Sequence, residues 1–284
     1  MTSSGEIQSR QNDEKLLKIQ YAARENYNFA EKLNHFAWLL CLVSASSIFL
    51  PDNCSKIASY GIPFVADIVA FFLIMLVNYK VKTAANLRRY FDSYVLDISP
   101  NQFTETELRK LKEVAEKEYS RNPQKAKVQM ANTGKDSPPG VHEWYVFAEP
   151  FIGIMAQFEC QRQNTWWNSK MSHHRLTASI CAVVLVGICF LLLLINNNVV
   201  STILCSAGLI IKIIERIIEN WQYISVSKEI TGSQKTIERQ PTAGGIEGLQ
   251  ILIDKRRAID VLELNWIHKK NANRLSKLYE DSIT

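Results

Sequence analysis

The chain has 284 residues, a formal net charge of +5 and 47% hydrophobic residues. This hydrophobic content excludes an intrinsically disordered chain, and 11 Gly, 8 Pro and 6 Cys exclude collagen-like and disulfide-scaffold classes. The charges are unevenly distributed, because residues 176–211 contain no Asp, Glu, Lys or Arg and residues 33–77 contain only three such residues. A single soluble globule is therefore not expected.

Residues 1–34 are predicted to form an N-terminal cytoplasmic helix. Asn12, Asp13 and Glu14 supply an N-cap and negative charge for its first turn. Apolar residues then recur every three or four positions from Leu16 to Leu33, which is the period of an amphipathic helix. The same helix is expected to continue into the apolar segment that follows.

Four apolar segments are predicted to span a membrane as two helical hairpins, residues 35–79 and residues 176–218. The individual spans are residues 35–50, 57–77, 176–195 and 199–218. The third has about 20 uncharged residues, enough to cross a hydrocarbon core ~30 Å thick. The short first and fourth segments are also compatible with buried core helices. Their pairing with a longer apolar neighbour across a tight polar turn favours membrane insertion.

The distribution of Lys and Arg predicts the orientation in the membrane. These residues are concentrated in residues 1–34, 80–175 and 212–284, and positively charged segments stay on the cytoplasmic side. Both termini and the middle segment are therefore expected in the cytoplasm, and only the turns near Asn53 and Asn197 reach the outer side. A mostly polar segment precedes the first apolar run, so no cleaved signal peptide is expected.

The middle cytoplasmic segment, residues 80–175, is predicted to be helical with one mobile loop. Thr104 and Glu107 have the spacing of a capping box at the start of a helix. Residues 122–142 contain Asn-Pro, Gly and Pro-Pro with few apolar residues, a composition typical of a loop.

The C-terminal cytoplasmic segment, residues 219–284, is predicted to contain two further helices. A turn at residues 240–245 precedes them, and they are expected over residues 246–261 and 262–279. No alternating strand pattern occurs anywhere in the chain. The predicted fold class is therefore all-α: an integral membrane protein with four transmembrane helices and cytoplasmic helical extensions.

Catalytic and metal-binding motifs are not found. Gly134-Lys135 lacks the upstream Gly and the following Ser or Thr of a phosphate-binding loop. His173 and His174 are adjacent, so on a helix they diverge and do not chelate one metal ion. The six cysteines include no Cys-x-x-Cys pair. Neither an enzyme nor a cofactor, a zinc site or a structural disulfide is expected.

The fourth span carries a polar stripe, the first candidate functional feature. Small and charged residues recur there at spacings of three and four, so they share one helix face; the candidates are Ser201, Cys205, Gly208, Lys212 and Glu215. One interpretation is a tight helix–helix seam in which Lys212 and Glu215 neutralise each other. The other is that the same stripe lines a pore in an oligomer, since charges at membrane depth face protein or water.

Asp67 in the second span is the other charge at membrane depth. It is a candidate for lining a cation pathway, because ionisable residues inside the membrane are costly and usually functional. The alternative is a hydrogen bond with Ser44 or Ser47 of the first span. The sequence does not decide between these two roles.

Four sequence elements together resemble the SMODS-associating four-transmembrane effector family, and the resemblance covers nearly the whole chain. They are Arg10-Gln11-Asn12, residues 88–96 (RRYFDSYVL), residues 160–168 (CQRQNTWWN) and residues 249–266, with Arg256-Arg257 and Asn265-Trp266. The Gln-Arg-x-Asn-x-Trp-Trp segment is the most specific of these elements. Pro100-Asn101 departs from the Trp-Asn pair that the family often shows after Val-Leu.

This resemblance implies a pore-forming effector of a bacterial antiphage defence system that acts by abortive infection. Such a protein would lie in the lipid bilayer of the inner membrane as a multi-pass homo-oligomer. It would permeabilise the membrane when a partner nucleotidyltransferase supplies a cyclic oligonucleotide, and no DNA partner is implied. The main alternative is a membrane-tethered scaffold that recruits a cytoplasmic partner. A small-solute transporter ranks below both, because four spans show no inverted repeat.

A cyclic oligonucleotide requires guanidinium groups for its phosphates and planar side chains for its bases. Arg162 with Trp166 is one candidate sensing pair, and Arg256-Arg257 with Trp266 is the second. The alternative is that the Trp residues anchor the protein at the headgroup level and that the Arg residues follow the charge bias of cytoplasmic segments.

Overall fold

The computed structural model describes most of the chain, and the described part is all-α. Described are residues 2–49, 56–98, 103–196, 198–259 and 265–283, without the side chains of 56–60, 196, 265–269, 272, 280, 282 and 283. These ranges contain no strand, only the isolated β-bridges Ser3–Ile152 and Thr133–His142. The predicted fold class is confirmed for them.

The helices follow one another with short connections. In chain order they are α1 (Ser4–Gln11), α2 (Glu14–Ser46), α3 (Lys56–Leu96), α4 (Glu105–Arg121), α5 (Pro123–Ala131), α6 (Ile154–Asn196), α7 (Val199–Cys205), α8 (Ala207–Arg239), α9 (Ala243–Arg257) and α10 (Asn265–Ile283). A 3-10 turn, Ser47–Phe49, extends the end of α2.

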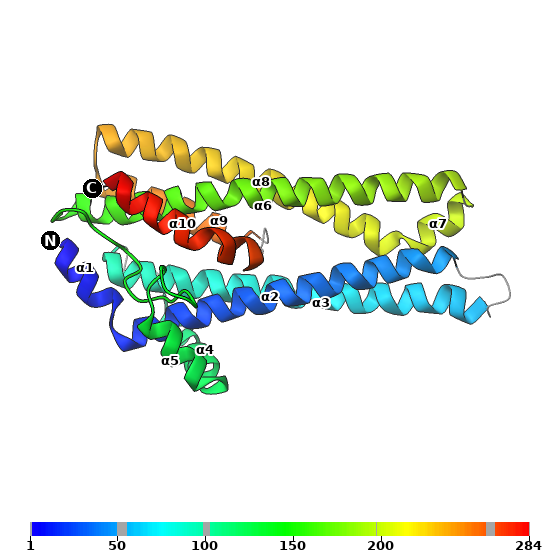
Figure 1. Ribbon diagram of the computed structural model, residues 1–284, viewed down its shortest axis with the longest axis horizontal. Coiled ribbons are helices and arrows are strands. Elements are labelled where there is room, and N and C mark those ends of the chain that lie inside the picture. Colours follow the sequence, from blue (N-terminus) through cyan, green and yellow to red (C-terminus); the bar gives the residue numbers. More distant parts are fainter. Residues whose placement is uncertain (1, 50–55, 99–102, 197, 260–264, 284) are drawn as a thin grey trace.

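Four long helices form the body of the molecule (Figure 1). α2 packs antiparallel against α3, and α6 packs against α8. The short α7 lies at the end of the molecule farthest from both termini, whereas α9 and α10 lie toward the termini and α4 and α5 project beside α2. We call the end with the termini the polar end and the end with α7 the apolar end.

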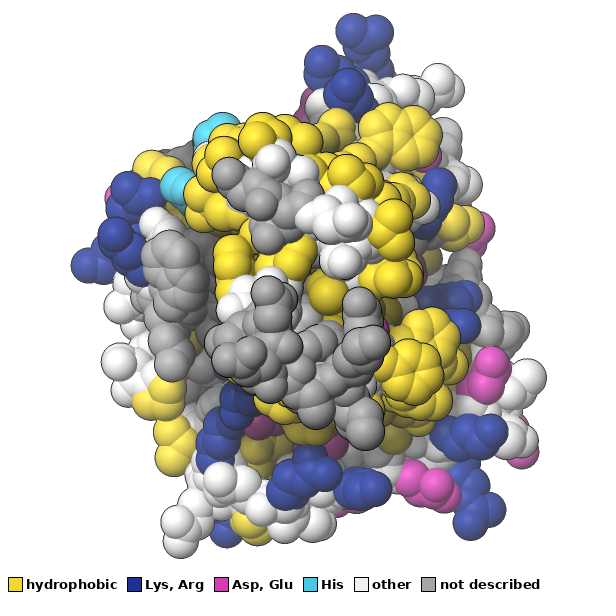
Figure 2. Space-filling model, turned by 90° about the vertical axis from the view of Figure 1, so that its right-hand side faces the viewer, with side chains coloured by type: hydrophobic (Ala, Val, Ile, Leu, Met, Phe, Trp, Pro, Cys, Tyr) yellow, Lys and Arg dark blue, Asp and Glu magenta, His cyan; other side chains and the backbone are white. Residues whose placement is uncertain are grey.

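Large hydrophobic side chains are exposed along four helical segments next to the apolar end, residues 36–49, 62–79, 180–195 and 199–221. At ~1.5 Å per residue, the third segment, which is one continuous helix, is about 23 Å long and covers most of the ~30 Å thickness of a membrane core. We call this surface the apolar belt. Figure 2 looks onto the apolar end, where hydrophobic side chains gather in the middle and Lys and Arg lie toward the edge.

Three helices in the described part, α2, α3 and α6, are long and apolar enough to cross a membrane. The fourth predicted span is not one helix, because the chain leaves helical geometry at Ser206 (φ −109°, ψ 9°) and divides the segment into α7 and α8. The four spans are therefore three continuous helices and one broken helix.

The largest hydrophobic core lies at the polar end, outside the belt. Its buried members include Leu87, Phe91 and Tyr145, together with Leu249 and Ile253 of α9. Within the belt the buried apolar contacts are made mostly by small residues, in the cluster Cys41, Ala45, Ala70 and Leu209. Small side chains let helix backbones approach closely in a membrane, where apolar burial alone gives little drive for association.

Continuous helices confirm two predictions. The Asp13 side chain accepts a hydrogen bond from the Lys15 amide (2.8 Å) and caps α2, which then runs into the belt without a break. Thr104 and Glu107 form both hydrogen bonds of the predicted capping box at the start of α4. α6 likewise extends from the polar end through the belt as a single helix.

The predicted loop over residues 122–142 is wrong for its first half, because α5 occupies Pro123–Ala131. The Asn122 side chain accepts from the Lys125 amide (3.1 Å), and Pro123 fills the first helical position. Asn followed by Pro is a helix start as well as a turn signal. The rest of the segment is held on α2, since Arg24 donates to the carbonyls of Pro139 and Gly140.

Candidate functional site

Two helices meet inside the apolar belt at a carboxylate. Asp67 of α3 lies beside Gly208 of α8, and its Oδ2 accepts a hydrogen bond from the Gly208 amide at 3.1 Å. A Cβ atom built on Gly208 would lie 2.3 Å from Oδ1 of Asp67, so any larger residue at this contact requires Asp67 to move. The other Asp67 oxygen, Oδ1, is shielded from solvent and has no hydrogen-bond partner among the described residues.

The break at Ser206 explains why a carboxylate is held there. Ser206 is the N-cap of α8, but its side chain makes no capping hydrogen bond. Gly208 is two residues further along, so its amide is one of the first N–H groups of α8 and has no acceptor within the helix. Asp67 supplies that acceptor from another helix, and its negative charge is favourable at a helix N-terminus.

The predicted bond between Asp67 and Ser44 or Ser47 is therefore not formed. The Ser44 hydroxyl donates to the Cys205 carbonyl at 2.9 Å, and the Ser47 hydroxyl donates to the Ser44 carbonyl at 2.7 Å. Ser44 thus satisfies the last carbonyl of α7, on the other side of the break. The two helix ends that meet at the break, the end of α7 and the start of α8, are therefore both bound by polar side chains of the first hairpin.

The stripe of the fourth span faces protein rather than the outside of the bundle. Lys212 is 0% exposed, and its Nζ lies 2.7 Å from Oε2 of Glu215. Cys205 is buried, and Ser201, Gly208 and Glu215 are partly buried. This arrangement matches the seam interpretation for the single chain, because the two charges neutralise each other.

Polar contacts continue along α8 toward the polar end, one turn after another. Arg216 pairs with Glu219 at 3.1 Å within α8. Asn220 donates to the hydroxyl of Ser179 in α6 at 2.9 Å. The Tyr223 hydroxyl accepts from Arg175, also of α6, at 2.9 Å. The spacing of the stripe continues to Glu219, but the contacts with α6 were not predicted from the sequence.

The predicted sensing residues lie in two separate places. Arg162 on α6 pairs with Glu159 at 2.6 Å, and the ring of Trp166 lies 5.1 Å from that of Tyr279 in α10. Arg256 lies on α9, where it is buried and donates to Oδ1 of Asn164 at 3.2 Å. The side chain of Trp266 lies outside the described residues.

Arg257 occupies the centre of the polar end. Its Nη1 lies 2.7 Å from Oδ2 of Asp92 and 3.1 Å from Oδ1 of Asp254. Asp92 also accepts from the Tyr145 hydroxyl at 2.7 Å and from Gln250 at 3.0 Å. Asp92 is thus bound by three side chains, two from α9 and one from the segment before α6, although the sequence assigned it no role.

Burial dominates the electrostatics of this region. It raises the pKa of Asp254 to about 6, although the nearby Arg257 guanidinium opposes the rise. Burial also lowers the pKa of Arg256 to about 10. The pKa of Arg257 is raised instead, because the Asp92 and Asp254 carboxylates outweigh the effect of burial.

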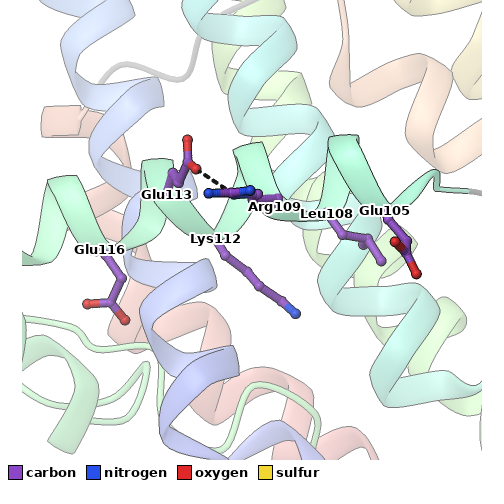
Figure 3. A pocket seen from close by; sticks show the side chains of 6 residues that line it. All are labelled: Glu105, Leu108, Arg109, Lys112, Glu113 and Glu116. Carbon is purple, nitrogen blue, oxygen red and sulfur yellow. Dashed lines mark hydrogen bonds and ion pairs between the residues drawn. The ribbon is translucent and has the colours of Figure 1, made fainter.

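The open hollow on α4 is not a comparable site. Its lining residues, shown in Figure 3, all come from one helix and carry both signs of charge; they are Glu105, Leu108, Arg109, Lys112, Glu113 and Glu116. Arg109 and Glu113 pair with each other at 3.2 Å on the exposed surface. Binding pockets usually combine groups from several elements in a concave, largely apolar setting, and this hollow does not.

Long apolar helices, the exposed apolar belt and a folded polar end define an all-α membrane protein. The chain belongs to the family of the SMODS-associating 4TM effector domain, whose model matches residues 5–261. The match covers α1 to α9 and ends before α10. It fits the all-α membrane fold, and the family is one of effectors associated with SMODS-type signalling systems rather than a known enzyme family. No curated protein and no solved structure matches the chain.

Proposed function

We propose that this protein is the membrane-permeabilising effector of a bacterial antiphage system that signals with nucleotides. Several copies assemble in the inner membrane, with both termini and the polar end in the cytoplasm. A cyclic oligonucleotide from a partner nucleotidyltransferase then triggers the opening of a path for ions. The family assignment supports the effector role, and the concentration of Lys and Arg at the polar end supports this orientation.

The observation that carries the proposal is the set of ionisable groups buried within the apolar belt. Lys212 and Asp67 lie between exposed apolar segments of the same helices. Spans that only anchor a protein need no such groups, and charges at membrane depth are costly unless they are paired. In the single chain they are paired with Glu215 and with the Gly208 amide.

The broken span supplies a means of rearrangement. α7 and α8 are joined at Ser206 without a capping bond from its side chain, so this junction depends on the bonds from Ser44 and Asp67. A rotation of α8 about the break breaks the Asp67 bond and turns the face with Lys212 toward a neighbouring copy. The seam residues of the closed chain then line the path in the oligomer.

Release of a dye from liposomes tests this proposal. Purified full-length protein is reconstituted in vesicles of phosphatidylethanolamine and phosphatidylglycerol, and cyclic di- and trinucleotides are added. We expect release only with a nucleotide, and slower release for Lys212→Met. Ile211→Met is the matched control, because the neighbouring Ile211 is exposed on the belt. Absence of release with every nucleotide, together with stable capture of a cytoplasmic partner, would favour the scaffold function.

A further inference from the structure

Four arginine side chains converge at the polar end, where α3, α6 and α9 meet. They are Arg88, Arg175, Arg256 and Arg257, which we call the guanidinium cluster. Arg175 is 9% exposed, Arg256 is 5% exposed and the Arg257 side chain is 8% exposed. Arg88 and Arg256 are both close enough to Arg257 to experience its charge.

Two carboxylates near the guanidinium cluster pair with the same arginine. Asp92 and Asp254 both pair with Arg257. Arg256 donates to the neutral amide of Asn164, and the guanidinium of Arg88 lies 4.4 Å from the centre of the Trp144 ring. Arg88, Arg256 and Arg257 therefore bring more positive charge to this region than the two carboxylates compensate.

Two donors of the cluster have no acceptor among the described residues. The Nε of Arg88 and the Nη2 of Arg257 are shielded from solvent and make no hydrogen bond within that part of the chain. An unsatisfied buried donor costs about 1–3 kcal/mol, and more when the group is charged. Buried polar groups are normally paired, so two free donors on neighbouring guanidiniums indicate a site for an anionic acceptor.

We propose that the guanidinium cluster binds the phosphodiester group of an anionic ligand, with Arg88 and Arg257 donating to its oxygens. The planar fork of a guanidinium matches two phosphate oxygens, which the ammonium group of lysine does not. The ring of Trp144 holds the Arg88 guanidinium in place. A cyclic oligonucleotide and an anionic lipid headgroup share this chemistry, and the first source rests on the proposed function.

The position of the cluster gives binding a mechanical consequence. Arg175 donates to the Tyr223 hydroxyl of α8, and the Tyr27 hydroxyl of α2 donates to the Arg257 carbonyl. Tyr223 lies on the same helix as Lys212 and Gly208, about four turns from Gly208 at ~3.6 residues per turn. An anion that reorders the cluster therefore acts directly on the polar end of the broken span.

Binding to full-length protein in nanodiscs tests the site separately from pore formation. The probes are cyclic di-AMP and cyclic tri-AMP in discs of phosphatidylcholine, and discs containing phosphatidylglycerol without nucleotide. Calorimetry follows the nucleotides, and native mass spectrometry counts retained phosphatidylglycerol. We expect Arg88→Gln to weaken binding of the preferred probe at least tenfold and Arg88→Lys to weaken it less. Arg109→Gln, on an exposed arginine of α4 outside the cluster, should stay within twofold of the wild type.

The outcomes separate this inference from the proposed function. Tryptophan fluorescence melting verifies that Arg88→Gln folds, which we expect because Arg88 makes no ion pair in the described part of the chain. If Arg88→Gln loses nucleotide binding, the ligand of the cluster is the nucleotide. If it loses retained phosphatidylglycerol, the ligand is the lipid headgroup. Either result supports the site. Wild-type binding by Arg88→Gln, or no binding of any probe, overturns it. Arg88-dependent nucleotide binding without dye release leaves the site intact and contradicts the pore.

Discussion

The contact between Asp67 and Gly208 makes the most specific prediction about the membrane part of the fold. In Gly208→Ala, the new methyl group meets Oδ1 of Asp67 at 2.3 Å and Cγ at 2.7 Å. Asp67 then has to move, which strains the packing and removes its hydrogen bond with the Gly208 amide. Overpacking costs about 1–3 kcal/mol and the loss of a bond to a charged group about 1.5–3 kcal/mol, so we expect a destabilisation of about 2.5–6 kcal/mol.

Thermal melting in detergent, followed by tryptophan fluorescence, measures this effect. For a chain of this size about 1 kcal/mol corresponds to about 2–4 °C, so the melting temperature of Gly208→Ala should fall by roughly 5–24 °C. Gly187→Ala is the matched control, since a Cβ atom at this belt glycine of α6 meets no atom within 4 Å. It should melt at or slightly above the wild-type temperature, because alanine favours helix by about 1 kcal/mol.

A second substitution tests the cause. Asp67→Ala removes all three carboxyl-group atoms that lie close to the new methyl group. The double variant should recover part of the lost stability, with a coupling free energy above about 1 kcal/mol. Equal melting of Gly208→Ala and Gly187→Ala, or no recovery in the double variant, would refute the capping role of Asp67.

Three further predictions concern charge and topology. Lys212→Glu places a second carboxylate beside Glu215 within the seam, so the amount of protein in the membrane fraction should fall. An unchanged amount with altered ion selectivity would show that this helix face meets water. Between pH ~4 and 6, Asp254 in the folded protein keeps a proton that the unfolded chain has lost. Its contribution to stability therefore decreases by up to about 3 kcal/mol as the pH rises to 7. Asp254→Asn should remove this part of the pH dependence of melting, and an unchanged dependence would contradict the raised pKa of Asp254. In intact cells that express a variant lacking Cys54, a cysteine introduced at Asn197 should react with a membrane-impermeant thiol reagent, and one introduced at Asn132 should not. Labelling at Asn132 would contradict the predicted orientation.

The continuous parts of the fold follow from local sequence patterns. Helical periodicity predicted that α2 extends from the polar end into the membrane, and Thr104 with Glu107 predicted the start of α4. Helix α1 was not predicted, although Ser3 and Glu6 form a capping box whose spacing is visible in the sequence. The break at Ser206 has no comparable signal, because the apolar segment continues through it.

The candidate sites were harder to predict, because they depend on contacts between distant residues. Asp67 and Gly208 are 141 positions apart, and Arg257 and Asp92 are 165 positions apart. Charge and spacing identified Asp67, Lys212 and Arg257 as unusual, but only the fold shows which groups satisfy them. Sequence proximity also joined Arg256 and Arg257 with Trp266, whereas the described contacts place these arginines against α3 and α6.

The central claim is that this protein opens an ion path in response to a nucleotide. Electrical recording across a planar bilayer tests this claim most directly. Full-length protein is incorporated from proteoliposomes, its presence is verified after recording, and cyclic di-AMP or cyclic tri-AMP is added on the side of the polar end. The account predicts discrete conductance steps that begin after nucleotide addition and whose ion selectivity differs between the wild type and Lys212→Met. A silent bilayer that contains the protein, at nucleotide concentrations that saturate its measured binding, would contradict the account.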